Sequence, residues 1–279
     1  MVAMLQIKNM SLNELDFAIN AAGSEGWNPG LNDGRSFYKI DPEGFFIATL
    51  DGEPIGCISA LAYNDHYGFI GFFMVSPEYR GKWVGFQLAK SALAYLGDRN
   101  IGLDGGIDKC EFYQNFGFKF AHKNIRFEGK ASINSVATAI PISEVNFAKL
   151  VEYDRQIFLF PRTEFLHQWI YQRDTFGYFL EDERHLVGYG IIRKSIEGYR
   201  IGPLFADNEF FANILLESLI SNIPSESYYL DIPELNASAL ELSHKFNMQK
   251  VFETVRMYSK EIPSVPLHKV FGITSFELG

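Results

Sequence analysis

The sequence repeats a set of landmarks at a nearly constant interval, which is close to half the length of the chain. The equivalent positions are Gly56 and Gly188, Gly71 and Gly202, Phe116-Gly117-Phe118 and Phe246-Asn247-Met248, and Arg126 and Arg256. A repeat of this length is as long as a typical domain, so the pattern predicts two similar domains in tandem. The small and polar stretch at 130–135 is typical of a linker. We therefore place the first domain at 1–130 and the second at 131–279.

Both halves show the same order of elements: a helix, two hairpin strands, a third strand, a helix, a strand, a helix and a last strand. In the first half Ser11 caps the first helix. The ranges expected after it are hairpin strands at 45–48 and 55–58, a strand at 69–75, a helix at 84–95, a strand at 101–104 and a helix at 110–116. The second hairpin is expected at 178–180 and 186–192. This order predicts an α+β fold in which each half is a mixed, mostly antiparallel α/β sheet flanked by helices.

The composition is that of a soluble globular protein, with 47% hydrophobic and 21% charged residues. A net charge of −9 argues against nucleic acid as a partner. Two cysteines, and six histidines without HxxxH or HxH spacing, predict neither a disulfide framework nor a metal site. The longest apolar run, at 68–75, is far shorter than the roughly 20 residues that span a membrane. The first residues do not resemble a signal peptide, so we expect a cytoplasmic protein.

The segment at 72–88 has the pattern of a buried strand, a turn and a helix whose first residues include Gly81 and Gly85. Free backbone N–H groups at a helix start form an anion site, and Arg80 and Lys82 add positive charge there. Glycine also lets a pyrophosphate approach the backbone. An ordinary connection between a strand and a helix can have the same pattern, so these residues alone leave ligand binding open.

The stretch Val-Ser-Pro-Glu-Tyr-Arg-Gly-Lys-Trp-Val-Gly at 75–85 resembles the acetyl-CoA pyrophosphate loop of the GNAT N-acetyltransferase superfamily, whose pattern is Gln/Arg-x-x-Gly-x-Gly/Ala. Arg80 takes the first position of that pattern and Gly85 the last, whereas Trp83 stands where the family has glycine. Downstream, residues 112–118 are similar to the family's Tyr-x-x-x-Gly-Phe segment. Neither GxxxxGK[ST] nor GxGxxG occurs, which disfavours other nucleotide-binding classes.

The resemblance, which covers about residues 40–128, implies that acetyl-CoA is the acyl donor. The backbone of Met74 and Val75 would pair with the pantetheine arm, and the amides of the following loop would hold the pyrophosphate. The coenzyme-binding residues that the family implies are Met74, Val75, Arg80, Gly81, Lys82, Trp83, Val84, Gly85 and Phe86. If the loop still binds the coenzyme, the indole of Trp83 must point away from the pyrophosphate. The alternative is a degenerate loop that no longer binds.

In the resembled mechanism an amine attacks the thioester directly, which requires a base, an oxyanion donor and an acid for the leaving thiolate. Tyr113 fits the acid by its place in the motif, although a helix tyrosine there also fits a packing role. Many relatives carry a glutamate on the fourth strand, but 69–75 contains no carboxylate. Asp104, Glu25 and a chain of waters remain as candidates for the base. Asp104 also fits a hydrogen-bonding residue at a strand end.

The loop at 25–33 contains a tryptophan and two acids among turn-forming residues. In the resembled fold this region lines the acceptor site, and an aromatic ring with carboxylates suits a cationic amine. The substrate-binding residues that we expect are Glu25, Trp27, Asn28 and Asp104. The same loop also fits a solvated connection in which Trp27 fills a gap in the core.

The second half lacks the residues of the coenzyme loop. At the repeat interval, 75–81 corresponds to 206–212, which contains neither the arginine nor the glycines. Ser243 stands at the position of Tyr113. The chain therefore resembles a tandem GNAT protein with a degenerate second domain, whose role is structural or is to close the acceptor site.

Two functions from different classes fit the sequence. The first is an acetyl-CoA-dependent N-acetyltransferase that acts on an amine of a small molecule or a peptide, with neither nucleic acid nor a membrane as its partner. The second is a non-catalytic module that binds acyl-CoA or another protein through an inherited GNAT fold.

Overall fold

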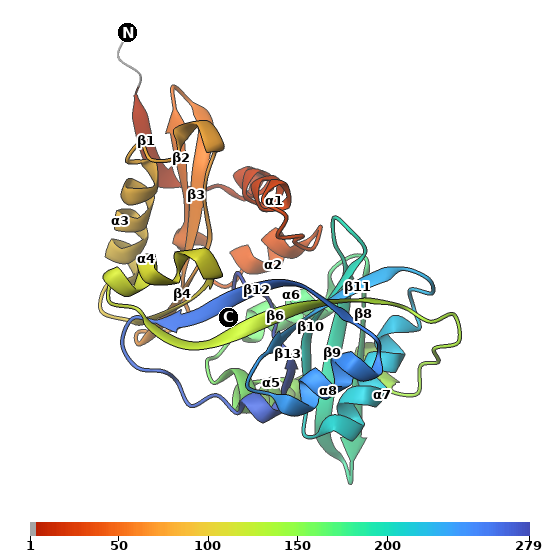
Figure 1. Ribbon diagram of the computed structural model, residues 1–279. Coiled ribbons are helices and arrows are strands. Elements are labelled where there is room, and N and C mark those ends of the chain that lie inside the picture. Colours follow the sequence, from red (N-terminus) through yellow and green to blue (C-terminus); the bar gives the residue numbers. More distant parts are fainter. Residues whose placement is uncertain (1–3) are drawn as a thin grey trace.

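The computed structural model describes residues 4–279 (Figure 1). Its first half has the expected order of elements with two additions: a strand, β1, at the start, and a second helix, α2, before the hairpin. The elements are β1 (Leu5–Asn9), α1 (Leu15–Ser24), α2 (Asp33–Tyr38), β2 (Phe45–Leu50), β3 (Glu53–Ala62), β4 (Tyr67–Val75), α3 (Val84–Leu96), β5 (Asn100–Gly106), α4 (Cys110–Asn115) and β6 (Lys119–Lys130). Ser11 starts the first helical segment as predicted. Its N–H and its hydroxyl donate to the Glu14 carboxylate at 2.8 and 2.7 Å.

The second half repeats this order, so the predicted tandem α+β architecture is confirmed. Its elements are β7 (Ile140–Pro141), α5 (Phe147–Phe158), α6 (Thr163–Tyr171), β8 (Thr175–Asp182), β9 (His185–Lys194), β10 (Tyr199–Ala206), α7 (Glu209–Ile220), β11 (Ser227–Pro233), α8 (Ala237–Lys245), β12 (Gln249–Tyr258) and β13 (Val270–Gly272). The two hairpins, β2–β3 and β8–β9, lie where the glycine pattern placed them.

The repeat is visible in the packing of individual glycines. A Cβ atom on Gly56 would lie 2.8 Å from the carbonyl oxygen of Met74, and one on Gly188 would lie 2.9 Å from that of Phe205. Both distances are shorter than side chains tolerate against backbone, so each hairpin requires glycine at this position. Met74 and Phe205 are themselves separated by the repeat interval. The same local constraint therefore operates in both halves.

The strands form one continuous sheet, because β6 of the first half and β12 of the second are exchanged between the halves. The order is β1-β2-β3-β4-β5-β12-β6-β11-β10-β9-β8-β7, with β13 paired to β10. Thus β12 lies beside β5 of the first half, and β6 lies beside β11 of the second. Figure 1 shows β6 and β12 running together between the two halves. The division at residue 130 marks where the repeat restarts along the chain, and neither segment contains a complete sheet of its own.

Two equivalent ion pairs connect the exchanged strands. Arg256 on β12 donates to Asp104 on β5 at 2.8 and 2.6 Å, and Arg126 on β6 donates to Asp231 on β11 at 2.7 and 3.0 Å. Each arginine lies directly opposite its aspartate in the strand register. The side chains are at most 8% exposed, so each partner depends on the other for its solvation.

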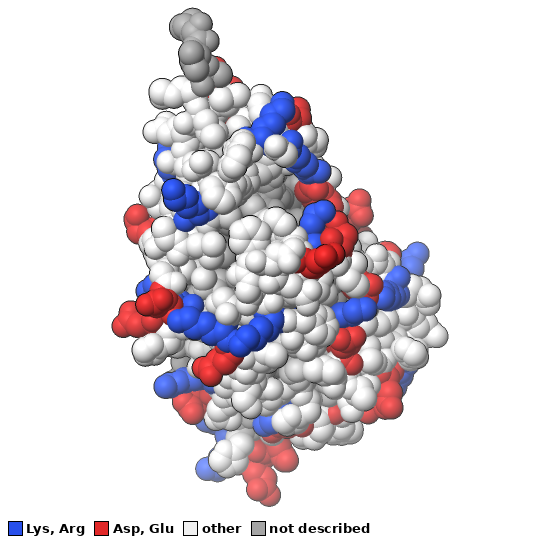
Figure 2. Space-filling view, turned by 60° about the vertical axis from the view of Figure 1, so that its left-hand side comes forward, with Lys and Arg blue, Asp and Glu red and all other residues white. Residues whose placement is uncertain are grey.

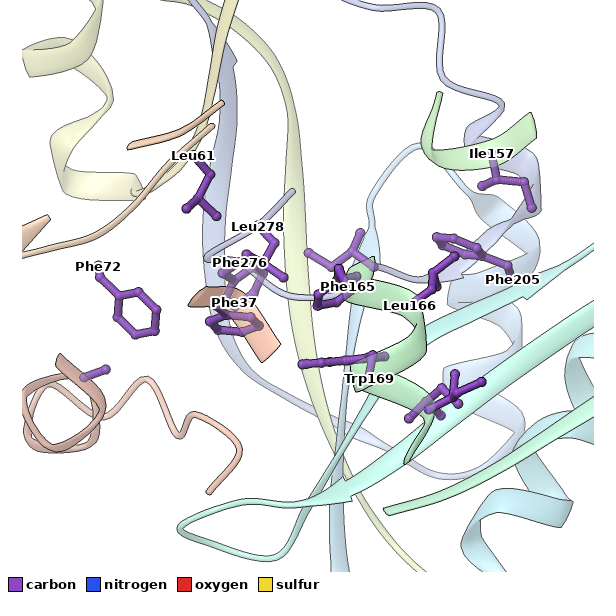
Figure 3. Packing of buried hydrophobic residues seen from close by; sticks show 14 of the residues in the cluster. Phe37, Leu61, Phe72, Ile157, Phe165, Leu166, Trp169, Phe205, Phe276 and Leu278 are labelled. Atoms are coloured by element: carbon purple, nitrogen blue, oxygen red, sulfur yellow. The ribbon is translucent and has the colours of Figure 1, made fainter. Parts of the chain in front are cut away.

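The hydrophobic core has one large part in each half and one between them, besides a small cluster of Tyr63, Tyr67, Phe69 and Tyr258. Helix α3 covers one face of β3 to β5, and α7 and α8 cover the equivalent face of β10 and β11. The third part brings together α1, α2, α5 and α6 with β4, and it includes Phe276 and Leu278 of the C-terminal segment. Figure 3 shows these two side chains next to Phe37, with Phe72 on one side and Phe165 on the other. Residues 270–279 are all buried.

Each half contains a strand that diverges from its parallel neighbour. Strand β4 pairs with β5 only from Tyr67 to Ile70. On its other side, the register between β4 and β3 shifts next to Phe72 of β4, which adopts a φ of 45°. Strand β10 pairs with β11 only from Tyr199 to Ile201 and shifts register against β9 before Leu204. A bulge of this kind redirects a strand, and it opens the sheet between β4 and β5.

Candidate functional site

The predicted pyrophosphate loop runs from the end of β4 to the start of α3. Gly81 has a φ of 74°, with no atom within 4 Å of the position that its Cβ would take, so the backbone conformation is what favours glycine there. The first i to i−4 bond of α3 joins the Gln87 N–H to the Trp83 carbonyl at 3.0 Å. The amides of residues 84–86 therefore precede the hydrogen-bonding ladder of the helix. Free amides of this kind can bind an anion, which is the role that the sequence predicts for this loop.

Trp83 stands where the family pattern has glycine, and its backbone adopts a conformation that glycine favours. It precedes α3 with a φ of 65°, in the left-handed region that glycine favours and a bulky residue adopts at a cost of about 1–3 kcal/mol. Its indole is 72% exposed and meets the ring of Phe86 edge-on, at 5.5 Å between centroids. The side chain therefore projects into solvent, which is the orientation expected if the loop still binds the coenzyme.

Arg80, which is predicted to contact the pyrophosphate, contacts Glu25, which is predicted for the acceptor site. Its Nη2 forms an ion pair with Glu25, and its Nε donates to the carbonyl of Val75 at 2.9 Å. The Arg80 and Glu25 side chains are 49% and 33% exposed, so the pair is a weak one that an anion can replace. On β4, Met74 is buried toward the core between the halves. Gly85 faces the sheet, and its Cβ would lie 3.5 Å from Phe73.

Tyr113 lies on α4, against the part of β5 that has separated from β4. A Cβ on Gly105 would lie 3.0 Å from Cδ2 of Tyr113, so this glycine provides the space for the ring. The Tyr113 ring also meets Phe118 edge-on at 6.2 Å. Its hydroxyl forms no hydrogen bond with any residue from 4 to 279. Burial, with a smaller effect of Asp108, raises the pKa of Tyr113 to about 12, so the phenol stays protonated at neutral pH.

Asp104 is fully engaged within the chain. Besides the two bonds from Arg256, its carboxylate accepts one from the amide of Asn124 at 2.9 Å, and the side chain is 0% exposed. These contacts match the hydrogen-bonding role that the sequence left open for Asp104. They leave this carboxylate poorly suited to act as the base.

The predicted acceptor loop is held by the second half of the chain. The side chain of Asn28 exchanges two hydrogen bonds with the backbone of Glu197, at 2.9 and 2.8 Å. Gly30 forms a β-bridge with Ser195, in the turn between β9 and β10. The carbonyl of Trp27 accepts a bond from Arg126 at 2.6 Å. The structure thus brings Glu25, Trp27 and Asn28 to the border between the halves, where the second half forms one side of the loop.

In the second half, β13 lies in the opening between the diverging strands β10 and β11. This strand pairs with β10 at Leu204 and Phe205, the residues equivalent to Phe73 and Met74 of β4. The sequence interpretation placed the pantetheine arm along β4 at Met74 and Val75. In the second half, a segment of the same chain lies along the corresponding part of β10. The sequence analysis missed β13, because a three-residue apolar strand carries no periodic signal.

The surface around the loop carries both signs of charge. Figure 2 is turned toward the side on which Figure 1 shows α3 and α4, and basic side chains there lie next to acidic ones instead of forming one continuous basic surface. Among residues 4–279, no helix is long and apolar enough to cross a membrane. The same residues include no group of three His, Cys, Asp or Glu side chains placed to hold a metal ion.

Comparison with known proteins identifies the family of the chain. Residues 12–118 match the model of the acetyltransferase (GNAT) family, and residues 150–272 match an acetyltransferase (GNAT) domain. Holothin acyltransferase from Pseudoalteromonas sp. (strain SANK 73390) is 30% identical over 98% of this chain and 94% of its own length. The chain therefore belongs to the GNAT family of acyltransferases. With two GNAT domains in one polypeptide, it is a tandem GNAT protein.

Solved structures share the whole fold. A putative acetyltransferase from Pyrococcus horikoshii has a TM-score of 0.82 at 21% identity, over 99% of this chain and 96% of that one. A tandem GNAT protein from the clavulanic acid biosynthesis pathway has a TM-score of 0.65 at 14% identity, over 94% of this chain and 100% of that one. The tandem arrangement is thus common to chains that differ widely in sequence.

Proposed function

We propose that the protein is an acetyl-CoA-dependent N-acetyltransferase whose donor site lies in the first half. The observation that supports this most strongly is the backbone at the start of α3, where Trp83 adopts a glycine-like φ of 65° and turns its indole to solvent. A loop released from coenzyme binding would have no reason to retain this strained conformation. The acyl donors of the GNAT family are generally acyl-CoA thioesters.

The residues present fit an acyl-CoA. The amides of residues 84–86, together with the side chains of Arg80 and Lys82, would hold the pyrophosphate. The opening between β4 and β5 after Ile70 leaves backbone groups of β4 without partners on β5, where an extended pantetheine arm would pair. When bound, the coenzyme supplies an acyl group activated as a thioester.

The protein's own contribution is to orient the donor and to manage protons. Tyr113 stays protonated at neutral pH, and it lies beside the opened edge of β5, so it can donate a proton to a departing thiolate. The loop at 25–33 would form one wall of the acceptor site. Its contacts with Glu197 and Ser195 hold that wall in place.

The acceptor that we propose is an amine of a small molecule or a peptide. Two features support this choice: the exposed Glu25 carboxylate and the partly buried Trp27 ring of the loop suit a cationic group, and the relative with 30% identity is named for acyl transfer to holothin. Holothin is therefore a reasonable first acceptor to test.

Release of free thiol from acetyl-CoA, followed with a thiol reagent, tests the proposal. We would use holothin, benzylamine and spermidine as acceptors, and mass spectrometry to detect an N-acetyl product. Thiol release that depends on the amine, with one N-acetyl group gained per thiol, would support the proposal. Saturable acetyl-CoA binding without turnover of any of the three amines would instead favour the non-catalytic binding module.

A further inference from the structure

Strand β4 carries no carboxylate, and the C-terminal segment places one beside it. Gly71 is the first residue of β4 beyond its last pair with β5, Ile70 with Leu103. A Cβ on Gly71 would lie 2.9 Å from Cα and 3.0 Å from the carbonyl carbon of Glu277. The backbone of Glu277 therefore occupies the space that a side chain of β4 would fill at the point where the two strands part.

Glu277 differs from the other buried carboxylates among the described residues. Each of those receives at least two hydrogen bonds from one arginine: Asp33 from Arg193, Asp104 from Arg256, Asp154 from Arg162, and Asp231 from Arg126. Glu277 is only 2% exposed, and one of its oxygens accepts a bond from the Ser275 hydroxyl. No described residue donates a hydrogen bond to Oε1. A buried carboxylate oxygen without a donor calls for a ligand group or an ordered water.

The charged groups that face Glu277 come from β6, β10 and β11. Arg200 on β10 lies closest, with 3.9 Å between its Nη1 and Oε1, which is beyond hydrogen-bond distance. Arg126 and Asp231 complete the cluster, so two positive and two negative charges balance. A purely structural role, as a counter-charge for the two arginines, is therefore the alternative that an experiment must distinguish.

The segment that carries Glu277 also reaches the predicted acceptor loop. The Phe276 ring lies 4.7 Å from the guanidinium carbon of Arg126, and the same guanidinium donates to the carbonyl of Trp27. The segment that carries Glu277 thus contacts β4, where the acyl group is expected, and reaches the loop at 25–33 through Arg126. Of the two carboxylates that the sequence offered as bases, Asp104 is held by Arg256 in a buried pair, and Glu25 forms a partly exposed pair with Arg80.

From this geometry we propose that Glu277 is the proton acceptor for the substrate ammonium group, in place of a carboxylate on β4. The inference rests on the proposed function. In the step, one N–H bond of the ammonium breaks, its electron pair stays on nitrogen, and Oε1 of Glu277 gains the proton, directly or through one water. The free amine then forms the C–N bond as the C–S bond of the thioester breaks. The proton on Glu277 returns to solvent. Tyr113 donates its phenol proton to the thiolate, and the second N–H proton of the amine then replaces it on Tyr113.

The test compares Glu277→Gln with the wild type across pH, using whichever of holothin, benzylamine and spermidine the wild type acetylates fastest. At neutral pH the variant should lose roughly 10²-fold in turnover, the usual scale for a positioned base. With an alkylamine, the loss should shrink to less than about tenfold near pH 10, because the amine then arrives deprotonated. The affinity for acetyl-CoA should not change. Glu277→Asp should recover part of the activity at neutral pH.

Thr274→Val is the matched control in the same segment. Thr274 accepts a hydrogen bond from Arg162 at 2.9 Å, so its loss should lower the melting temperature but leave the shape of the pH profile unchanged. Either of two results for Glu277→Gln would show that Glu277 is only a structural counter-charge. One is a lowered melting temperature with a wild-type pH profile, and the other is a loss of turnover that high pH does not restore. Absence of turnover in the wild type would overturn the proposed function together with this inference.

Discussion

Arg256 and Asp104 face each other across β12 and β5, although 152 residues separate them in the chain. The pair joins β12 of the second half to the sheet of the first, and Arg126 with Asp231 forms the equivalent pair in the other direction. Because each half lends a strand to the other, the proposed donor site in the first half depends on β12. Folding of the complete chain is therefore a condition for forming that site.

Arg256→Ala should lower the free energy of unfolding by about 3–5 kcal/mol, because it leaves the buried Asp104 carboxylate without its counter-charge. Urea denaturation at neutral pH measures the loss. Replacing both partners, as in Asp104→Leu with Arg256→Met, should recover most of it, since no unpaired charge remains. Lys149→Ala serves as the control. It removes a largely exposed pair with Glu181 and should cost about 1 kcal/mol or less. A similar small effect for Arg256→Ala would contradict the buried-pair argument.

Acid should destabilise the protein through His122. Burial, and to a lesser extent Arg256, lowers the pKa of His122 to about 3, whereas the unfolded chain titrates near the ordinary value of about 6.5. The stability that neutral His122 allows is complete above about pH 6.5 and declines as pH falls toward 3. The decline between pH 6.5 and 5 should be roughly 2 kcal/mol. Urea unfolding of the wild type and of His122→Gln at pH 7 and pH 5 tests this. A decline of the same size in the variant would assign it to other groups.

The sequence predicted the parts of the molecule that local patterns encode. The glycine spacing located both hairpins. The apolar run that ends just before Ser76 located β4 and the start of α3. Each of these features depends on contacts between segments that lie close together along the chain. The motif also identified the loop whose backbone amides lie free at the helix start.

What the sequence did not indicate depends on contacts between distant segments. Nothing near Arg256 shows that it faces Asp104 rather than a residue of its own half, because the exchange of β6 and β12 preserves every local pattern. The sequence did not indicate the burial of residues 270–279 for the same reason. Glu277 reaches β4 only because β13 pairs with β10, and a search for acidic residues on the fourth strand does not find it.

Acetyl-CoA should bind with one molecule per chain, because β13 already pairs with the part of β10 that corresponds to the donor strand. Isothermal titration gives the stoichiometry, and the melting temperature should rise on binding. Arg80→Glu should abolish both signals, since it places a negative charge at the predicted phosphate site. Lys90→Glu, an exposed change on the same helix, is the control and should retain them. Two molecules bound per chain, or undiminished binding by Arg80→Glu, would contradict a single donor site at this loop.

Trp83 should report coenzyme binding by fluorescence. Of the three tryptophans, Trp169 is 0% exposed and Trp27 is partly buried, whereas Trp83 is 72% exposed beside the predicted phosphate site. Acetyl-CoA should therefore change the emission of Trp83 and leave that of Trp169 nearly constant. In Trp83→Phe most of the change should disappear while the affinity, measured by calorimetry, stays within a few-fold. An unaltered fluorescence response in that variant would place the coenzyme away from this loop.

Tyr113→Phe separates a proton donor from a packing residue. If the phenol protonates the departing thiolate, its removal should lower kcat by roughly 10²-fold or more, while the affinity for acetyl-CoA stays nearly unchanged because the ring still packs against Gly105. The hydroxyl forms no hydrogen bond within residues 4–279, so its removal leaves no described partner unsatisfied and should change the melting temperature little. Steady-state kinetics with saturating amine, together with calorimetric binding of acetyl-CoA, measures both quantities. Equal turnover in the two proteins would remove Tyr113 from the mechanism and would indicate that the thiolate takes its proton from solvent.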